Sequence, residues 1–186
     1  MAQLISNEQP EGFQYIPDFL SVTEEHQVLQ QIEGLNFETV RMHDVVAKRR
    51  VLHFGWLYGY ESWQLTAGPP VPEWLMPLRE RVASLISVPP MELEQVLISQ
   101  YLPGSGIGWH RDAPMFGPTV AGLSLRGHCR FRFQRKRGEI RDVSECLLEP
   151  RSAYLLSGPS RSAWQHCIPP TKSLRYSITF RTLKDA

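Results

Sequence analysis

Hydrophobic residues recur at helical spacing in two stretches of the first half of the chain. Ser21 and Glu24 precede the first stretch with the residue types and spacing of a capping box, in which each side chain binds the other residue's backbone N–H. The first stretch predicts a helix over about residues 22–34, and the second predicts one that begins near Pro72 and Glu73 and stops before Pro89. The apolar residues that set the two patterns are Val22, Val28, Leu29, Ile32 and Leu35, then Leu75, Leu78, Val82, Leu85 and Ile86.

Beyond Pro90 the pattern changes to short β-rich segments separated by turn residues. We expect strands over residues 96–102, 107–112, 121–125, 129–134, 153–157 and 174–182. Many short strands with small turns are typical of a double-sheet roll or barrel. The two early helices would then pack on one face of it. The expected fold class is therefore mainly β with flanking helices.

The length of 186 residues suits one domain with its own core, and no repeat or linker divides the chain. We expect a single domain over residues 1–186, with the helices in 1–90 and the β-rich core in 91–186. No run approaches the roughly 20 apolar residues of a membrane span, and the first residues lack the order of a signal peptide. These features predict a soluble, cytoplasmic monomer. The three cysteines, far apart and without a C-x-x-C pair, are expected to be reduced thiols.

The formal net charge of +1 conceals a strong asymmetry. Residues 1–40 hold seven acidic residues and no Lys or Arg, whereas residues 126–141 hold seven basic residues against Glu139 alone, a formal charge of +6. A polyanion such as a nucleic acid could dock on the second segment and would be repelled by the first. The alternative is a solvated basic strand pair balanced by an acidic helix.

His110 and Asp112 are two residues apart on an expected strand, so their side chains should point the same way. His166 lies on another expected strand that could bring it alongside. Two imidazoles and one carboxylate make a facial triad, which holds Fe(II) and leaves one side open for a co-substrate and O2. The alternative for the His110 pattern alone is a surface strand with a salt bridge.

A second signal comes from the segment 175–181, in which apolar and polar residues alternate strictly. Arg175 and Arg181 fall on its polar face together with Ser177 and Thr179. Two guanidinium groups there could enclose a small dicarboxylate, since each can donate two parallel hydrogen bonds. A phenol at Tyr101 could add a third donor. These parts fit an iron site with 2-oxoglutarate as co-substrate, and the alternative is an edge strand with a wet face.

This combination resembles the AlkB family of Fe(II)/2-oxoglutarate-dependent dioxygenases. The matching stretches are residues 99–104, 110–112, 157–161, 166 and 175–181, in the family's order. The resemblance implies a double-stranded β-helix (jelly roll), iron held by His110, Asp112 and His166, and 2-oxoglutarate held by Tyr101, Arg175 and Arg181. It departs from the family at Ser99 and Ser177, where Asn is frequent.

The N-terminal half of such enzymes carries a lid over the iron, and residues 49–61 are similar to that lid. Arg50 could hold a phosphate while Trp56 or Tyr58 stacks on an extruded base, because aromatic faces accept any base. The alternative is that Phe54, Trp56 and Tyr58 simply pack this strand onto the core. The remaining histidines have no ligand partner at metal spacing and are interpreted as surface or packing residues: His26, His43, His53 and His128.

The resemblance implies an oxidative dealkylase that acts on N-alkylated bases in DNA or RNA, in DNA repair or RNA demethylation. Its cofactor and co-substrates would be Fe(II), 2-oxoglutarate and O2, and its partner an alkylated nucleic acid. Two alternatives stay open at this point. One is a hydroxylase of a tRNA modification or of a protein side chain, and the other is a non-catalytic nucleic-acid-binding module.

Overall fold

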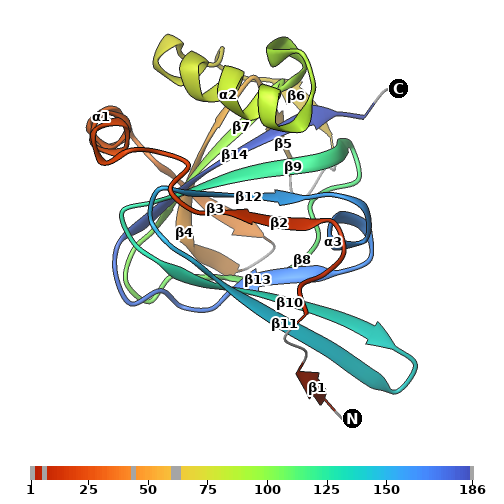
Figure 1. Ribbon diagram of the computed structural model, residues 1–186. Coiled ribbons are helices and arrows are strands. Elements are labelled where there is room, and N and C mark those ends of the chain that lie inside the picture. The colour runs from red at the N-terminus through yellow and green to blue at the C-terminus, as the bar shows by residue number, and fades with distance from the viewer. Residues whose placement is uncertain (1–2, 6–7, 43–44, 60–63, 185–186) are drawn as a thin grey trace.

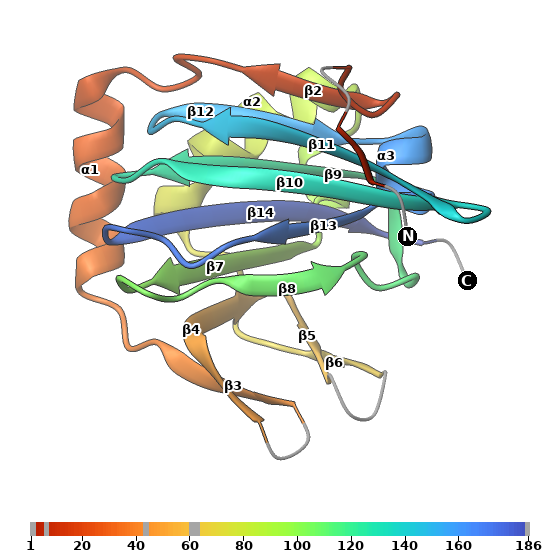
Figure 2. The ribbon, with the colours of Figure 1, turned by 90° about the horizontal axis from the view of Figure 1, so that it is seen from below.

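The computed structural model describes residues 3–5, 8–42, 45–59 and 64–184. Its strands form two main sheets that lie over one another (Figure 1 and Figure 2). The seven-stranded sheet has the order β2 (Phe13–Ile16), β12 (Ser152–Leu156), β9 (Phe116–Leu125), β14 (Arg175–Leu183), β7 (Gln95–Tyr101), β4 (Val45–Phe54) and β3 (Glu38–Met42). The five-stranded sheet has the order β1 (Gln3–Ile5), β11 (Ile140–Leu148), β10 (Cys129–Arg137), β13 (Gln165–Ile168) and β8 (Ile107–His110). A small hairpin joins β5 (Trp56–Tyr58) to β6 (Leu65–Ala67).

The first predicted helix is confirmed as α1 (Val22–Glu33), and it begins at the predicted capping box. The Glu24 backbone N–H donates to the Ser21 hydroxyl at 3.2 Å, and the Ser21 N–H donates to the Glu24 carboxylate at 2.7 Å. Val28 and Ile32 face the core, whereas Val22 is 69% exposed. The apolar stripe of this helix is therefore shorter than the sequence pattern indicates.

The second predicted helix is confirmed as α2 (Met76–Ile86), which follows a 3-10 turn (Glu73–Leu75). Pro77 lies in its first turn, where a backbone N–H would have no partner in the helix.

None of the helices in the described ranges combines the length and the apolar character needed to cross a bilayer. The other helical segments are a 3-10 turn (Pro90–Glu92) and the short α3 (Gly158–Ser162).

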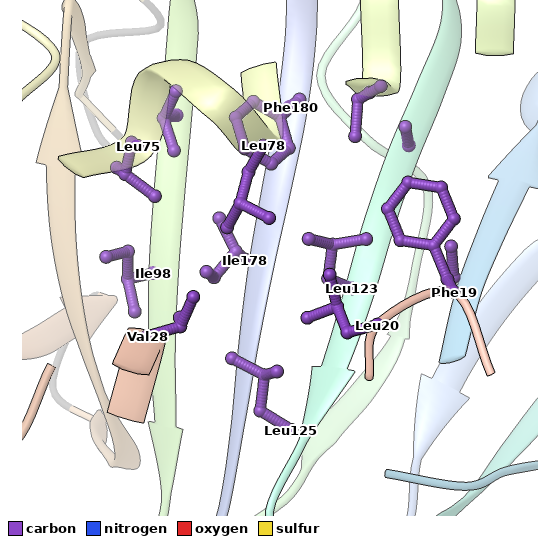
Figure 3. Close-up of a cluster of buried hydrophobic side chains, with 14 of the residues drawn as sticks. Phe19, Leu20, Val28, Leu75, Leu78, Ile98, Leu123, Leu125, Ile178 and Phe180 are labelled. Carbon is purple, nitrogen blue, oxygen red and sulfur yellow. The ribbon is translucent and has the colours of Figure 1, made fainter. Parts of the chain in front are cut away.

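One hydrophobic core lies between the helices and the outer face of the seven-stranded sheet (Figure 1 and Figure 3). Figure 3 shows Leu75 and Leu78 above the strands that carry Ile98, Ile178 and Phe180. A second buried cluster lies on the inner side of that sheet, against the five-stranded sheet. Its members are Tyr101, Val120, Cys129, Phe131, Phe133, Leu148, Tyr154, Leu156, Trp164 and Ile168.

Strand β14 lies between β9 and β7 in the middle of the large sheet, so it is not an edge strand. Its apolar residues join the helix-side core, and the alternating polar residues face the other way, as predicted. Both faces are buried. The polar face of β14 therefore lies inside the molecule, between the two sheets, and this is what places Arg175 and Arg181 near the candidate site.

The expected mainly β fold with flanking helices is confirmed, but the strand content extends further than the sequence indicates. Strands β2 and β4 come from residues 1–90 and pair with the core strands β12 and β7, and β3 pairs with β4. The β-rich arrangement therefore does not begin at residue 91. The organisation as one domain stays a prediction.

Candidate active site

The two predicted histidines and Asp112 come together at the end of β8. His110 and His166 are direct cross-strand partners of β8 and β13, and their ring centroids are 4.3 Å apart. Oδ2 of Asp112 lies 3.6 Å from Nε2 of His166. β8 ends at His110, so the predicted strand was two residues too long. The loop after β8, and not strand alternation, brings Asp112 beside the histidines.

Both imidazoles are neutral because they are buried. Burial lowers the pKa of His166 to about 3, helped by the neighbouring His110, and burial also lowers the pKa of His110. Nδ1 of His110 lies 2.9 Å from the Gly108 carbonyl oxygen, which only accepts, so the ring carries its proton there. Nε2 of His110 is then the nitrogen with a free lone pair, the form in which histidine binds a metal.

The Asp112 carboxylate is ionised and held by Arg181. Nη2 of Arg181 donates to Oδ1 of Asp112 at 2.5 Å, and the two side chains are only 10% and 5% exposed. Burial opposes the negative charge, but the positive charge of Arg181 outweighs it and holds the pKa of Asp112 well below its ordinary value. Asp112 is thus a carboxylate at any pH at which the protein would work.

Two neutral imidazoles and an ionised carboxylate are the donor set that Fe(II) takes in a facial triad, so these residues fit the ion. Within the described residues, however, no three His, Cys, Asp or Glu side chains already stand as a finished metal site. Asp112 would offer Oδ2 to an ion, because Oδ1 accepts the hydrogen bond from Arg181. Their role as ligands stays a prediction.

Arg175 is fully buried beside Tyr101 and has unused hydrogen-bonding capacity. Its Nε donates to the Ser124 hydroxyl at 3.2 Å, and its guanidinium lies over the Tyr101 ring at 5.1 Å. Nη1 and Nη2 are buried and have no hydrogen-bond partner among the described residues. A buried guanidinium without a counter-ion is costly, so this pair of nitrogens fits a carboxylate such as that of 2-oxoglutarate.

One cavity between the sheets is lined by both histidines, Asp112, Tyr101 and Arg181, whereas Arg175 is not among its lining residues. Tyr101, Ser99, Ser177 and Thr179 contribute its polar wall, and Phe131 lies on the apolar side. The residues that line it are Arg49, Leu97, Ser99, Tyr101, Ile107, His110, Asp112, Phe131, Tyr154, His166, Ile168, Ser177, Thr179 and Arg181. The cavity therefore holds all three predicted iron ligands and two of the three residues predicted for 2-oxoglutarate.

Two of the three predicted substrate residues, Arg50 and Trp56, are not among the residues that line this cavity. Arg50 is exposed and shares its face of β4 with Leu52 and Phe54, which pack toward the helices, whereas Arg49 lines the cavity. The indole N–H of Trp56 donates to the Glu94 carboxylate at 3.2 Å. The side chain of Tyr58 lies outside the described part of the structure. Substrate roles for Arg50, Trp56 and Tyr58 stay predictions.

Arg161 is a residue at the site that sequence reasoning did not assign. From α3 it donates to the backbone carbonyls of Asp112 at 3.0 Å, Ala113 at 2.9 Å and Phe116 at 3.3 Å. It therefore fixes the loop that carries Asp112. These hydrogen bonds join residues more than forty positions apart, so no local pattern indicates them. The only signal in the sequence is the place of Arg161 in the segment 157–161, which resembles the family.

The basic segment forms the hairpin of β10 and β11, which projects from the body of the molecule (Figure 1). Four of its seven basic residues lie near two acids of the returning strand. Arg130 and Arg132 lie near Glu145, and Arg135 and Arg137 lie near Asp142. The two acids on the returning strand lower the field that the count over residues 126–141 indicates.

Comparison with known proteins decides the family. The model of the 2OG-Fe(II) oxygenase superfamily matches residues 12–181. This chain belongs to that superfamily. The enzyme is accordingly a 2-oxoglutarate-dependent dioxygenase of AlkB type, and the predicted family is confirmed.

Several relatives carry AlkB-type names. The "Alkylated DNA repair protein ALKBH8 homolog" of Arabidopsis thaliana is 29% identical over 94% of this chain and 59% of its own length. The "Probable RNA/DNA demethylase ALKBH6" of Danio rerio is 29% identical over 90% of this chain and 74% of its own length. The "tRNA (carboxymethyluridine(34)-5-O)-methyltransferase alkbh8" of Xenopus tropicalis is 30% identical over 91% of this chain but 27% of its own length. The dioxygenase chain thus spans from about a quarter to about three quarters of these relatives.

A solved structure supports the fold of the oxygenase. The structure of OsALKBH1 superposes with a TM-score of 0.74 at 16% identity, over 95% of this chain and 99% of that chain. Together with the two facing sheets, this likeness confirms the predicted jelly roll.

Proposed function

We propose that this dioxygenase removes alkyl groups oxidatively from N-alkylated bases in DNA or RNA, with His110, Asp112 and His166 holding iron. The observation that carries the proposal is a cavity lined by two neutral imidazoles and an ionised carboxylate, with the guanidinium of Arg175 over the Tyr101 ring and its two terminal nitrogens without a hydrogen-bond partner among the described residues. Names of the Arabidopsis and Danio relatives support a nucleic acid as the substrate.

The chain's own residues would bind and orient the reactants. Arg175 would take the far carboxylate of 2-oxoglutarate with its two terminal nitrogens, and Tyr101 would lie along it. Arg181 would keep Asp112 ionised and oriented. Apolar side chains such as Phe131 and Ile168 would exclude water from the cavity.

Bound iron, 2-oxoglutarate and O2 supply hydroxylation of a C–H bond, coupled to conversion of 2-oxoglutarate to succinate and CO2. On an N-methyl base the hydroxylated carbon leaves as formaldehyde, and the nitrogen keeps a proton in place of the methyl group. The base is thereby restored without cleavage of the nucleic-acid chain.

The test measures succinate in the presence of Fe(II), 2-oxoglutarate and O2, together with the mass of methylated DNA and RNA oligonucleotides. We expect succinate formation, loss of one CH2 unit from the methylated base, and no turnover with His110→Ala. The matched control is His128→Ala, because His128 lies in the turn before β10 and away from the cavity. Turnover that survives His110→Ala would refute the assigned site.

A second candidate is hydroxylation of a modified tRNA base, since the name of the Xenopus relative refers to a modified uridine of tRNA. The chemistry at the site would be the same, but the hydroxyl group would stay on the product. Mass spectrometry of treated tRNA separates the two functions, because hydroxylation adds one oxygen atom where demethylation removes one CH2 unit.

A further inference from the structure

A chain of hydrogen bonds links strand β4 to the Asp112 carboxylate. Arg181 holds Asp112 with Nη2 and donates from Nη1 to the side-chain oxygen of Gln95 at 2.9 Å. The amide nitrogen of Gln95 lies 3.2 Å from Nδ1 of His53. The three residues come from β14, β7 and β4, which are neighbours in the seven-stranded sheet.

The chemistry of the groups fixes the direction of each bond. Arg181 can only donate, so Gln95 presents its oxygen to Arg181 and its amide hydrogens to His53. His53 must accept at Nδ1, which its neutral form can do. Burial, together with the positive charges of Arg181 and Arg49, lowers the pKa of His53 to about 4. The chain of bonds is therefore complete at neutral pH.

Gln95, in the middle of this series of hydrogen bonds, is held firmly in place. Gln95 has no exposed surface and is the direct cross-strand partner of Arg181. With Nη1 fixed on Gln95, the guanidinium of Arg181 cannot turn away from Asp112 without breaking a second hydrogen bond in a buried place, where that loss is costly.

The outer end of this series of hydrogen bonds lies where the β5–β6 hairpin begins. β5 starts three residues after His53, and its Trp56 donates to Glu94, the residue before Gln95. At the junction, a side chain on Gly55 would overlap the backbone of Glu94. The base of the hairpin is thus packed and bonded against Glu94, which directly precedes the residue that holds Arg181.

We propose that Gln95 and His53 are positioning residues for Asp112, which hold the Arg181 guanidinium against that carboxylate and couple its orientation to the base of the β5–β6 hairpin. The inference rests on the proposed role of Asp112 as an iron ligand. Loss of a residue that orients a metal ligand commonly weakens metal binding by about ten- to hundredfold.

The test measures Mn(II) affinity of the full chain, without 2-oxoglutarate or O2. Gln95→Met keeps the length of the side chain but removes both hydrogen bonds, and we expect about tenfold weaker binding. Gln100→Met is the matched control, because Gln100 lies on the same strand but bonds the Tyr176 hydroxyl at 3.2 Å. Its Mn(II) affinity should be unchanged. Equal affinities for the wild type and Gln95→Met would overturn the proposal.

His53 offers a second pair of variants if Gln95→Met does not fold. His53→Leu removes the acceptor and should weaken Mn(II) binding, whereas His53→Asn offers an amide oxygen near the position of Nδ1 and should restore it. If both variants bind Mn(II) like the wild type, the proposal is wrong.

A double-mutant cycle separates positioning from general packing. In an Arg181→Met background, Gln95→Met should cause no further loss of Mn(II) affinity, since Gln95 acts through Arg181. Additive losses would contradict the relay. A wild-type chain that does not bind Mn(II) at all would refute the proposed iron site itself, which is a different outcome from wild-type binding with unaffected variants.

Discussion

The inner face of β14 carries an arginine at each end, and the two are bound differently. Arg181 gives its terminal nitrogens to Gln95 and Asp112. Arg175 bonds Ser124 through Nε, and its terminal nitrogens have no hydrogen-bond partner among the described residues. In the sequence the two residues are equivalent members of one alternating segment. In the structure one end of the strand is a completed ion pair and the other is an open binding group.

The two arginines of β14 therefore have different roles. Arg181 neutralises and orients a protein carboxylate, so its charge is used before any ligand binds. Arg175 keeps a buried charge uncompensated, which the fold tolerates only at a cost in stability that a carboxylate ligand would offset. The two arginines should therefore respond in opposite ways to removal of the charge.

Arg181→Met should have the largest effect on stability. It leaves Asp112 buried without its cation, and breaking such a pair commonly costs about 4 kcal/mol. The measurement is the free energy of unfolding of the ligand-free protein in urea. Arg126→Met serves as the control, since Arg126 pairs with Glu33 on the surface and its loss should cost less than about 1 kcal/mol. Equal losses for both variants would remove the distinction between a buried and an exposed pair.

Arg175→Met should leave the ligand-free protein as stable as the wild type or make it more stable, because an uncompensated buried charge is removed. Its affinity for 2-oxoglutarate should fall about 100-fold, the equivalent of two charge-assisted hydrogen bonds. Calorimetric titration of the metal-loaded protein with 2-oxoglutarate measures this loss.

Arg175→Lys sharpens the same prediction. Lysine keeps the charge but not the two parallel donors, so affinity for 2-oxoglutarate should lie between those of the wild type and Arg175→Met. If Arg175→Met instead destabilises the ligand-free protein as much as Arg181→Met, the interpretation of Arg175 as an open binding group is wrong.

The sequence predicts this strand well because the relevant signal is local. Strict alternation over residues 175–181 assigns two faces without knowledge of the neighbours, and the Ser21 capping box is likewise contained in four positions. His110 and His166 were also placed correctly as a pair, since both lie on short strands that pair directly.

Features that depend on register and loops could not be predicted. Gln95 contacts His53 across 42 positions and Arg181 across 86, and no local pattern joins them. Arg49 and Arg50 are adjacent, so a one-residue shift in strand register exchanges which of them faces the cavity. Arg49 lines the cavity, and Arg50, predicted to hold a phosphate, is exposed.

As the pH is lowered, the contacts around Arg181 should be destabilised at a higher pH than the contacts around Arg175. The unfolded chain takes up a proton on His53 below about pH 6.5, whereas folding lowers the pKa of His53 to about 4, so stability falls as the pH drops through that window. The slope should be roughly 1 kcal/mol per pH unit for this one group. His110 and His166 act in the same direction, because their pKa values are lowered too. Arg175 adjoins Ser124 and Tyr101, and neither of these residues carries an imidazole or a carboxyl group.

Urea unfolding between pH 7 and pH 5 measures this effect. His53→Asn should reduce the pH dependence of the unfolding free energy by about one proton. Arg175→Met should leave the pH dependence as in the wild type. If both variants reduce the pH dependence of the unfolding free energy equally, the charges at the two ends of β14 influence each other.

The smallest effect is expected outside β14, at exposed cations of the β10–β11 hairpin. Lys136 is exposed near the tip, where neighbouring arginines are paired with Asp142. Lys136→Glu should weaken binding of a single-stranded oligonucleotide a few-fold and reduce the slope of log affinity against log salt by about one. Lys172→Glu, an equal charge change in the turn before β14, should leave that slope unchanged. A phosphate contact made at Lys136 itself would change the salt dependence only in Lys136→Glu. If both variants change the salt dependence equally, the net charge of the molecule, and not the hairpin, attracts the nucleic acid.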